Sequence, residues 1–147
     1  MTRDSTKPTI GWREWVGLPE LGVDAIEVKV DTGARSSALH AFDARSFEKN
    51  GAEFVRFTIH PERGDENRSI EAECEVIARR WVTSSSGHRT RRPVIRTTIE
   101  LLGRTWPIEV TLSNRDTLGF RMLLGRQAIQ RRFLVDVSKS YLGGTNA

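Results

Sequence analysis

An aspartate followed by threonine and glycine ends an alternating apolar segment at residues 28–34. Gly33 allows the backbone to bend sharply and lie against a substrate, and the Thr32 hydroxyl can hold its neighbours by a hydrogen bond. The carboxylate of Asp31 would then be fixed at a strand end with restricted solvation. The same tripeptide also suits an ordinary Asx-type turn, so other parts of the chain must decide between the two readings.

A second segment near the other end of the chain has a complementary character. Residues 122–125 form a short apolar strand that closes on Gly125, and Arg126 follows directly. Residues 127–132 are the stretch with the clearest helical composition. We therefore expect a strand that leads through a glycine into a short helix.

Other catalytic chemistry finds little support in the sequence. His40, His60 and His88 are widely separated, Cys74 is the single cysteine, and there is no HExxH or acidic calcium loop. No glycine-rich turn ends in lysine before a long helix, as a P-loop requires. Residues 84–88 place serines near a histidine, but as a polar turn without an orienting acid. We expect no metal, no nucleotide and no other cofactor.

The basic residues are mainly arginines. Lysine and arginine total 23 against 19 acidic residues, a net charge of +4, and only four of the 23 are lysines. Arginine recognises carboxylate and phosphate with a planar fork, which favours an acidic peptide or nucleic acid as partner. A solvated basic surface is the alternative.

Length and hydropathy predict one compact domain over residues 1–147, with flexible tails at 1–7 and 143–147. No apolar run approaches the roughly 18 residues of a membrane-spanning helix, and the first eight residues lack the apolar core of a secretory signal. We expect a cytoplasmic protein with no membrane contact.

Short alternating segments separated by turn signals predict an all-β domain with one short helix. Asn50-Gly51 and Gly103 are the clearest turns. The expected strands cover residues 10–16, 25–30, 53–59, 69–81, 94–102, 106–112 and 133–137, in addition to the strand that ends at Gly125.

The chain resembles the retropepsin-like aspartic peptidases. It is most similar to a bacterial group, RimB-like and often labelled an ATP-dependent zinc protease, that accompanies RimK-type glutamate ligases acting on a ribosomal protein. The blocks that carry the resemblance are residues 10–14, 18–19, 29–41, 85–87, 92–94, 111–115, 122–126 and 133–138. The resemblance implies a closed β-barrel of the retropepsin type and a peptidase that trims glutamate tails.

The resemblance also assigns roles. Asp31 is implied as the catalytic carboxylate, with Thr32 and Gly33 completing the catalytic loop. Leu124 and Gly125 are implied as its structural support. Because the chain has one Asp-Thr-Gly, the second aspartate of the catalytic pair should come from a second copy, which predicts a homodimer.

Ala34, Arg35, Ser37 and Arg126 are the candidate substrate-binding residues. Viral retropepsins usually carry an acidic residue at the position of Arg35, and that residue pairs with the arginine equivalent to Arg126. Two arginines cannot form this ion pair, and a cluster of both would favour substrate carboxylates. Alternatively, either arginine has a structural role and pairs with an aspartate, the candidates being Asp43, Asp116 and Asp136.

Three functions stay open. The leading one is trimming of poly-glutamate extensions from a ribosomal protein. The second is a general endopeptidase with the same mechanism. The third is a non-catalytic basic β-barrel that binds RNA. The tryptophans look like core or edge residues and form no evident stacking platform, so we expect nucleic acid contact only through a ribosomal substrate.

Overall fold

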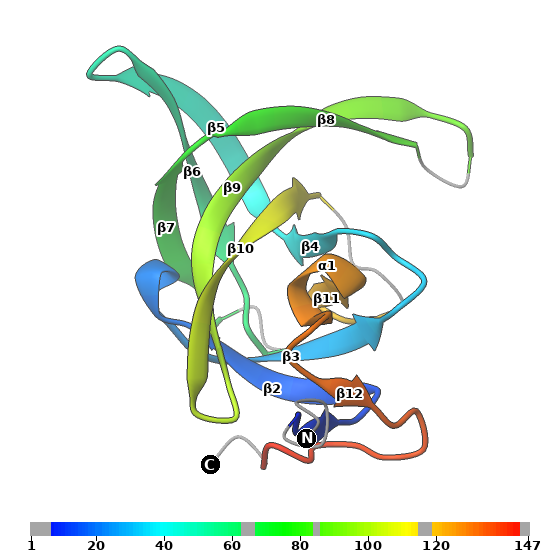
Figure 1. Cartoon of the computed structure of the whole chain (residues 1–147). Helices are drawn as coiled ribbons and strands as arrows, with labels where there is room; N and C mark the ends of the chain where they lie inside the picture. The colour runs from blue at the N-terminus through cyan, green and yellow to red at the C-terminus, as the bar shows by residue number, and fades with distance from the viewer. Residues whose placement is uncertain (1–6, 63–66, 84–85, 115–118, 145–147) are drawn as a thin grey trace.

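A computed structural model describes residues 7–62, 67–83, 86–114 and 119–144. They are mostly in strands, with a short 3-10 helix and one short α-helix among them (Figure 1). The elements are β1 (Thr9–Ile10), β2 (Arg13–Leu18), η2 (Pro19–Leu21), β3 (Val23–Asp31), β4 (Ser37–His40), β5 (Phe42–Lys49), β6 (Ala52–Ile59), β7 (Ile70–Glu75), β8 (Ala78–Thr83), β9 (Arg89–Leu101), β10 (Arg104–Ser113), β11 (Met122–Gly125), α1 (Arg126–Ile129) and β12 (Leu134–Val135).

Six strands pair in a ring, in the order β9, β10, β4, β11, β3, β2 and back to β9. β9 and β10 form an antiparallel hairpin whose turn, Leu102 and Gly103, has positive φ at both residues. β4 pairs in parallel with β10, and β11 pairs in parallel with β3. The parallel pairing of β11 and β3 matters for function, because it places the ends of these two strands side by side.

Two hairpins, β5–β6 and β8–β9, extend beyond the ring at the top of Figure 1. β5, β6 and β7 form a separate three-stranded antiparallel sheet, and β8 pairs with β9. Arg79 of β8 donates to Ser46 Oγ at 2.9 Å and also contacts the Glu53 carboxylate, which joins the β8–β9 hairpin to this small sheet.

The core lies inside the ring and reflects the period of two in its strands. Ile26 and Val28 of β3 are fully buried, as are Leu112 of β10 and Leu124 of β11. Glu27, on the opposite face of β3, is also buried, and its carboxylate accepts a hydrogen bond from the Tyr141 hydroxyl. The C-terminal segment thus covers the outer face of β3.

Glu14 fastens this C-terminal segment from within. Its side chain is fully buried and accepts backbone amides from Gly11 at 2.7 Å, Leu142 at 2.9 Å and Gly143 at 2.9 Å. A flexible tail was expected to begin at residue 143, but Gly143 is held in place because its amide donates to the buried Glu14 carboxylate. Residues 1–6 and 145–147 of the expected tails lie outside the described residues.

The all-β prediction with one short helix is confirmed, but several boundaries were wrong. The strand expected over residues 69–81 is two strands, β7 and β8, and the helix expected over 127–132 is only α1. β4 and β5 were missed. In β5 most side chains are exposed, so its sequence lacks the apolar alternation by which a half-buried strand is recognised.

Candidate active site

Asp31 is the last residue of β3, where the alternating strand delivers it to the turn at Thr32 and Gly33. Its side chain is partly buried, and its Oδ1 accepts the amide of Gly33 at 3.0 Å. The Asp31 carbonyl accepts the amide of Ala34 at 3.1 Å, which closes the turn. The carboxylate is thus held by its own loop while Thr32 and Gly33 stay exposed.

The strand that ends in Gly125 lies directly beside this loop. Gly125 is the register partner of Asp31 in the parallel β3–β11 pair. A Cβ added at Gly125 would lie 2.3 Å from the carbonyl oxygen of Ser36, so only glycine fits between strand and loop. The amide of Gly125 donates to the buried hydroxyl of Ser37 at 3.0 Å, and fully buried Leu124 anchors the strand in the core.

The first turn of α1 binds the same loop through its backbone. The amide of Arg126 donates to the Ala34 carbonyl at 2.8 Å, and the amide of Gln127 donates to the Arg35 carbonyl at 3.1 Å. The first amides of an α-helix have no carbonyl partner within the helix, so these two are free to bind the loop. Segments from the two ends of the chain therefore fix the loop that carries Asp31.

The two arginines of the site behave differently. Arg126 donates from Nη1 to the carbonyl of Gly33 at 3.2 Å and, more weakly, to that of Thr32 at 3.4 Å. Arg35 is exposed and has no carboxylate partner among the described residues. Asp43 pairs instead with Arg45, Asp136 accepts from Ser138, and Asp116 lies outside the described residues.

The β8–β9 hairpin faces the loop after Asp31 across an open cavity of about 330 Å³. Residues of the loop and of β4 line one part of it: Ala34, Ser36, Ser37 and Ala38. Residues from β8, β10 and β11 complete it: Arg80, Trp81, Val82, Thr111, Ser113 and Leu123. We refer to this space as the loop cavity. A smaller cavity of about 270 Å³ places Arg35 near Arg80, Glu109 and Gln127.

The structure brings all of the predicted site residues into one assembly of loop, strand and helix start. Ser37 lines the loop cavity, but its hydroxyl is occupied by the Gly125 amide. Sequence reasoning missed Arg80 and Trp81. The tryptophans were expected at core or edge positions. Trp81 is 56% exposed and lies at an edge, whereas Trp106 is buried in the core. The sequence of β8 indicates a strand, but nothing in it shows that this strand lies across a cavity from the loop after Asp31.

The three histidines do not meet at one site. His40 and His60 both pack on Phe42, with ring centroids at 4.1 Å and 4.3 Å, whereas His88 lies on the β8–β9 hairpin. Within the described residues no three His, Cys, Asp or Glu side chains form a group suited to a metal ion. In the same part of the chain, no helix has the length and apolar character needed to cross a membrane.

Comparison with known proteins agrees with this geometry. Residues 9–145 match the RimB-like family model, described as retropepsin-like aspartic endopeptidase RimB. The chain belongs to the RimB-like family. The match covers β3 with Asp31, the β8–β9 hairpin and β11 with α1, which are the elements that build the site.

Relatives of this RimB-like chain include larger proteins. Two are named "Probable alpha-L-glutamate ligase": one from Desulfotalea psychrophila, 43% identical over 97% of this chain, and one from Shewanella pealeana, 44% identical over 92%. This chain spans 33% and 30% of their lengths, about a third of each. A crystal structure of Lpg0085, of unknown function, from Legionella pneumophila is also similar. It has a TM-score of 0.75 and 28% identity, and the match covers 92% of this chain and 98% of that one.

Proposed function

We propose that the chain is an aspartic peptidase in which Asp31 activates water against a peptide bond. The observation that supports this most directly is the way Asp31 is held at the end of β3, with Oδ1 on the Gly33 amide and with Gly125 as its strand neighbour. A carboxylate fixed in this way, in a loop whose following residues line the loop cavity, can act as a general base without reorganising during the reaction. On this proposal, the ring of strands is a closed barrel of the retropepsin type.

The second carboxylate of the pair is Asp31 of a second copy, related by a two-fold axis. Two close carboxylates share one proton, because both cannot easily be ionised together. The ionised member takes a proton from water as the water oxygen bonds to the scissile carbonyl carbon, and the protonated member donates to the carbonyl oxygen. Collapse of this tetrahedral species breaks the C–N bond. One of its hydroxyls returns a proton to the ionised member, and the leaving nitrogen takes a proton from the other member, so the pair again holds one proton.

The substrate that we propose is an acidic peptide, such as a poly-glutamate extension on a protein. Arg35 has no carboxylate partner among the described residues. It lines a small cavity with Arg80 and Glu109, and Glu109 pairs with Arg80 at 3.9 Å. The family relatives named as glutamate ligases point to glutamate chemistry, but this chain spans only about a third of them. We propose that this shared third removes glutamate residues and does not add them.

Mass spectrometry of a glutamylated peptide incubated with the pure protein tests the proposal. We expect progressive loss of glutamate with the wild type and a rate at least about a hundredfold lower with Asp31→Asn, which removes the base at nearly constant size. Asp24→Asn is the matched control, because Asp24 is exposed at the opposite end of the same strand. It should keep the wild-type rate.

Two results would contradict the proposal. One is a purified Asp31→Asn protein that turns over normally. The other is lengthening of the peptide when ATP, magnesium and glutamate are added, because that result would assign ligation to this segment. Both can be read in the same mass spectra, as mass losses or gains of whole glutamate residues.

A further inference from the structure

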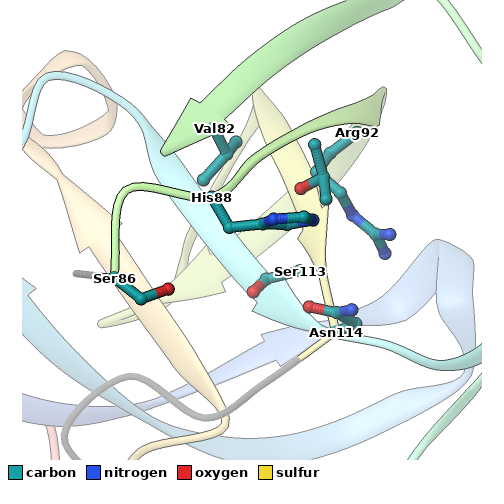
Figure 2. A pocket seen from close by; sticks show the side chains of 7 residues that line it. Val82, Ser86, His88, Arg92, Ser113 and Asn114 are labelled. Atoms are coloured by element: carbon teal, nitrogen blue, oxygen red, sulfur yellow. The ribbon is translucent and has the colours of Figure 1, made fainter. Parts of the chain in front are cut away.

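A second cavity opens beneath the tip of the β8–β9 hairpin and is not part of the site described above. It encloses about 370 Å³ and is lined by Val82, Ser86, His88, Thr90, Arg92, Ser113 and Asn114. Figure 2 shows the imidazole of His88 lying between Val82 on one side and Ser113 and Asn114 on the other. The Arg92 side chain extends along the same cavity toward the side of Asn114. We call this space the hairpin pocket.

Arg92 gives the hairpin pocket a positive charge that no described carboxylate pairs with. Its Nε donates to the Leu112 carbonyl at 2.8 Å, which fixes the guanidinium beside the end of β10. Within the described residues Arg92 forms no ion pair. Burial lowers the pKa of Arg92, and the positive charge of Arg79 lowers it further. A partly buried cation without a carboxylate partner favours an anion in the adjoining space.

The hairpin pocket adjoins the loop cavity, because Val82 and Ser113 line both. A peptide that occupied both cavities would follow a path from the loop after Asp31, past Arg80, to Arg92 and His88. An extended peptide advances about 3.3 Å per residue and projects alternate side chains to opposite sides. A chain lying in this path can therefore place one carboxylate at the hairpin pocket while another part of it lies beside the catalytic loop.

We propose that the hairpin pocket is a subsite for a carboxylate of an acidic peptide, with the Arg92 guanidinium as its main donor and His88, Ser86 and Asn114 as further polar contacts. This rests on the proposed function, since the peptide is the substrate proposed above. A peptide fits better than RNA because no Phe, Tyr or Trp lines the pocket, and Arg89 already stacks on nearby Trp81 at 4.7 Å.

Binding to protein that carries Asp31→Asn tests the subsite without turnover. The Asp31→Asn protein is the parent, and the test variant carries Arg92→Gln in addition. Tetraglutamate and its neutral isostere tetraglutamine would be titrated into each protein by calorimetry at low salt. We expect tetraglutamate to bind the parent and tetraglutamine to bind at least about tenfold more weakly. Arg92→Gln should weaken tetraglutamate about tenfold or more and leave tetraglutamine unchanged. Arg96→Gln is the matched control, because Arg96 is exposed on the same strand and pairs with Glu109.

A second variant guards against a folding defect, since Arg92 also bonds to the Leu112 carbonyl. His88→Gln changes an exposed side chain of the pocket and should weaken tetraglutamate several-fold with an unchanged melting temperature. Folded Arg92→Gln and His88→Gln proteins that bind tetraglutamate like their parent would overturn the subsite. So would an oligouridylate that binds more tightly than tetraglutamate and displaces it from the parent.

The failure of the subsite and the failure of the proposed function can be distinguished. Cleavage of the glutamylated peptide by the wild type, combined with tetraglutamate binding that ignores Arg92, overturns the subsite alone. Binding that depends on Arg92, in a protein that never cleaves the peptide, supports the subsite and contradicts the peptidase proposal.

Discussion

At the scale of single residues, the two arginines beside Asp31 have different surroundings and therefore different expected roles. Arg126 binds the carbonyls of Thr32 and Gly33, so its guanidinium helps to set the path of the loop after Asp31. Arg35 lies at the same edge of the site but is exposed and has no carboxylate partner within the described residues. Arg126 therefore fits a positioning role, whereas we expect Arg35 to contact the proposed substrate.

Steady-state kinetics on acidic and neutral peptides would separate these roles. Arg35→Ala should raise KM for a poly-glutamate peptide roughly tenfold, because one charge-assisted contact is lost, and should change a neutral peptide much less. Arg126→Ala should instead lower kcat for both peptides, since the loop that holds Asp31 loses its support. If Arg35→Ala leaves the preference for acidic peptides intact, selection by charge does not act at this residue.

The placement of a candidate site residue could be predicted where the residue belongs to a short sequence motif. Asp31, Gly33, Gly125 and Arg126 belong to short motifs whose chemistry is local, and the structure brings them together. Arg92 is different, because its proposed role depends on β9 placing it beside the end of β10, where it has no acidic partner among the described residues. Such a role depends on long-range packing, which motif and spacing do not encode.

At the scale of elements, the β8–β9 hairpin lies between the loop cavity and the three-stranded sheet β5–β6–β7. Its base is tied to the small sheet through Arg79, which contacts Glu53 of β6. The hydrogen bond from Arg79 is the largest cause of a lowered pKa for Glu53, and the charge of Arg79 adds to it. The hairpin that forms one wall of both cavities is therefore held by an ion pair at its base.

Glu53→Gln tests that ion pair through the pH dependence of stability. Because the pKa of Glu53 is lower in the folded state, its contribution to stability is present above the unfolded pKa, near 4.5, and is lost as the pH falls through the folded value. At neutral pH the variant should be less stable by about 0.2–1 kcal/mol, the usual range for an exposed pair. Urea unfolding should show the difference shrinking below about pH 4. An equal difference at all pH values would contradict the assignment.

Strand prediction succeeded where one face of a strand is buried and failed elsewhere. β3 and β10 alternate between core and outer side chains and were expected nearly at their observed bounds. β5 is largely exposed, and the β7–β8 connection lacks Gly, Pro or Asn at the point where the chain leaves the small sheet. Neither feature leaves a local signal in the sequence.

At the scale of the whole molecule, Glu14 links the N-terminal strand region to the C-terminal segment. Glu14→Gln leaves at least one of three buried or partly buried amides without its acceptor, so we expect a loss of about 1–3 kcal/mol in the free energy of unfolding. Chemical denaturation would measure it, with exposed Glu48→Gln on β5 as the control. Hydrogen exchange should accelerate at Leu142 and Gly143, and unchanged exchange there would contradict this role for Glu14.

The proposed catalytic pair requires Asp31 from two copies of the chain, and subunit mixing tests this requirement most directly. Wild-type protein would be equilibrated with about a ninefold excess of Asp31→Asn protein, and hydrolysis of the glutamylated peptide would be measured per wild-type chain. If each active site needs two intact Asp31 carboxylates, random exchange leaves about a tenth of the wild-type chains in intact dimers, and activity should fall to about a tenth. Activity per wild-type chain that is unaffected by the excess would contradict a site shared between two copies.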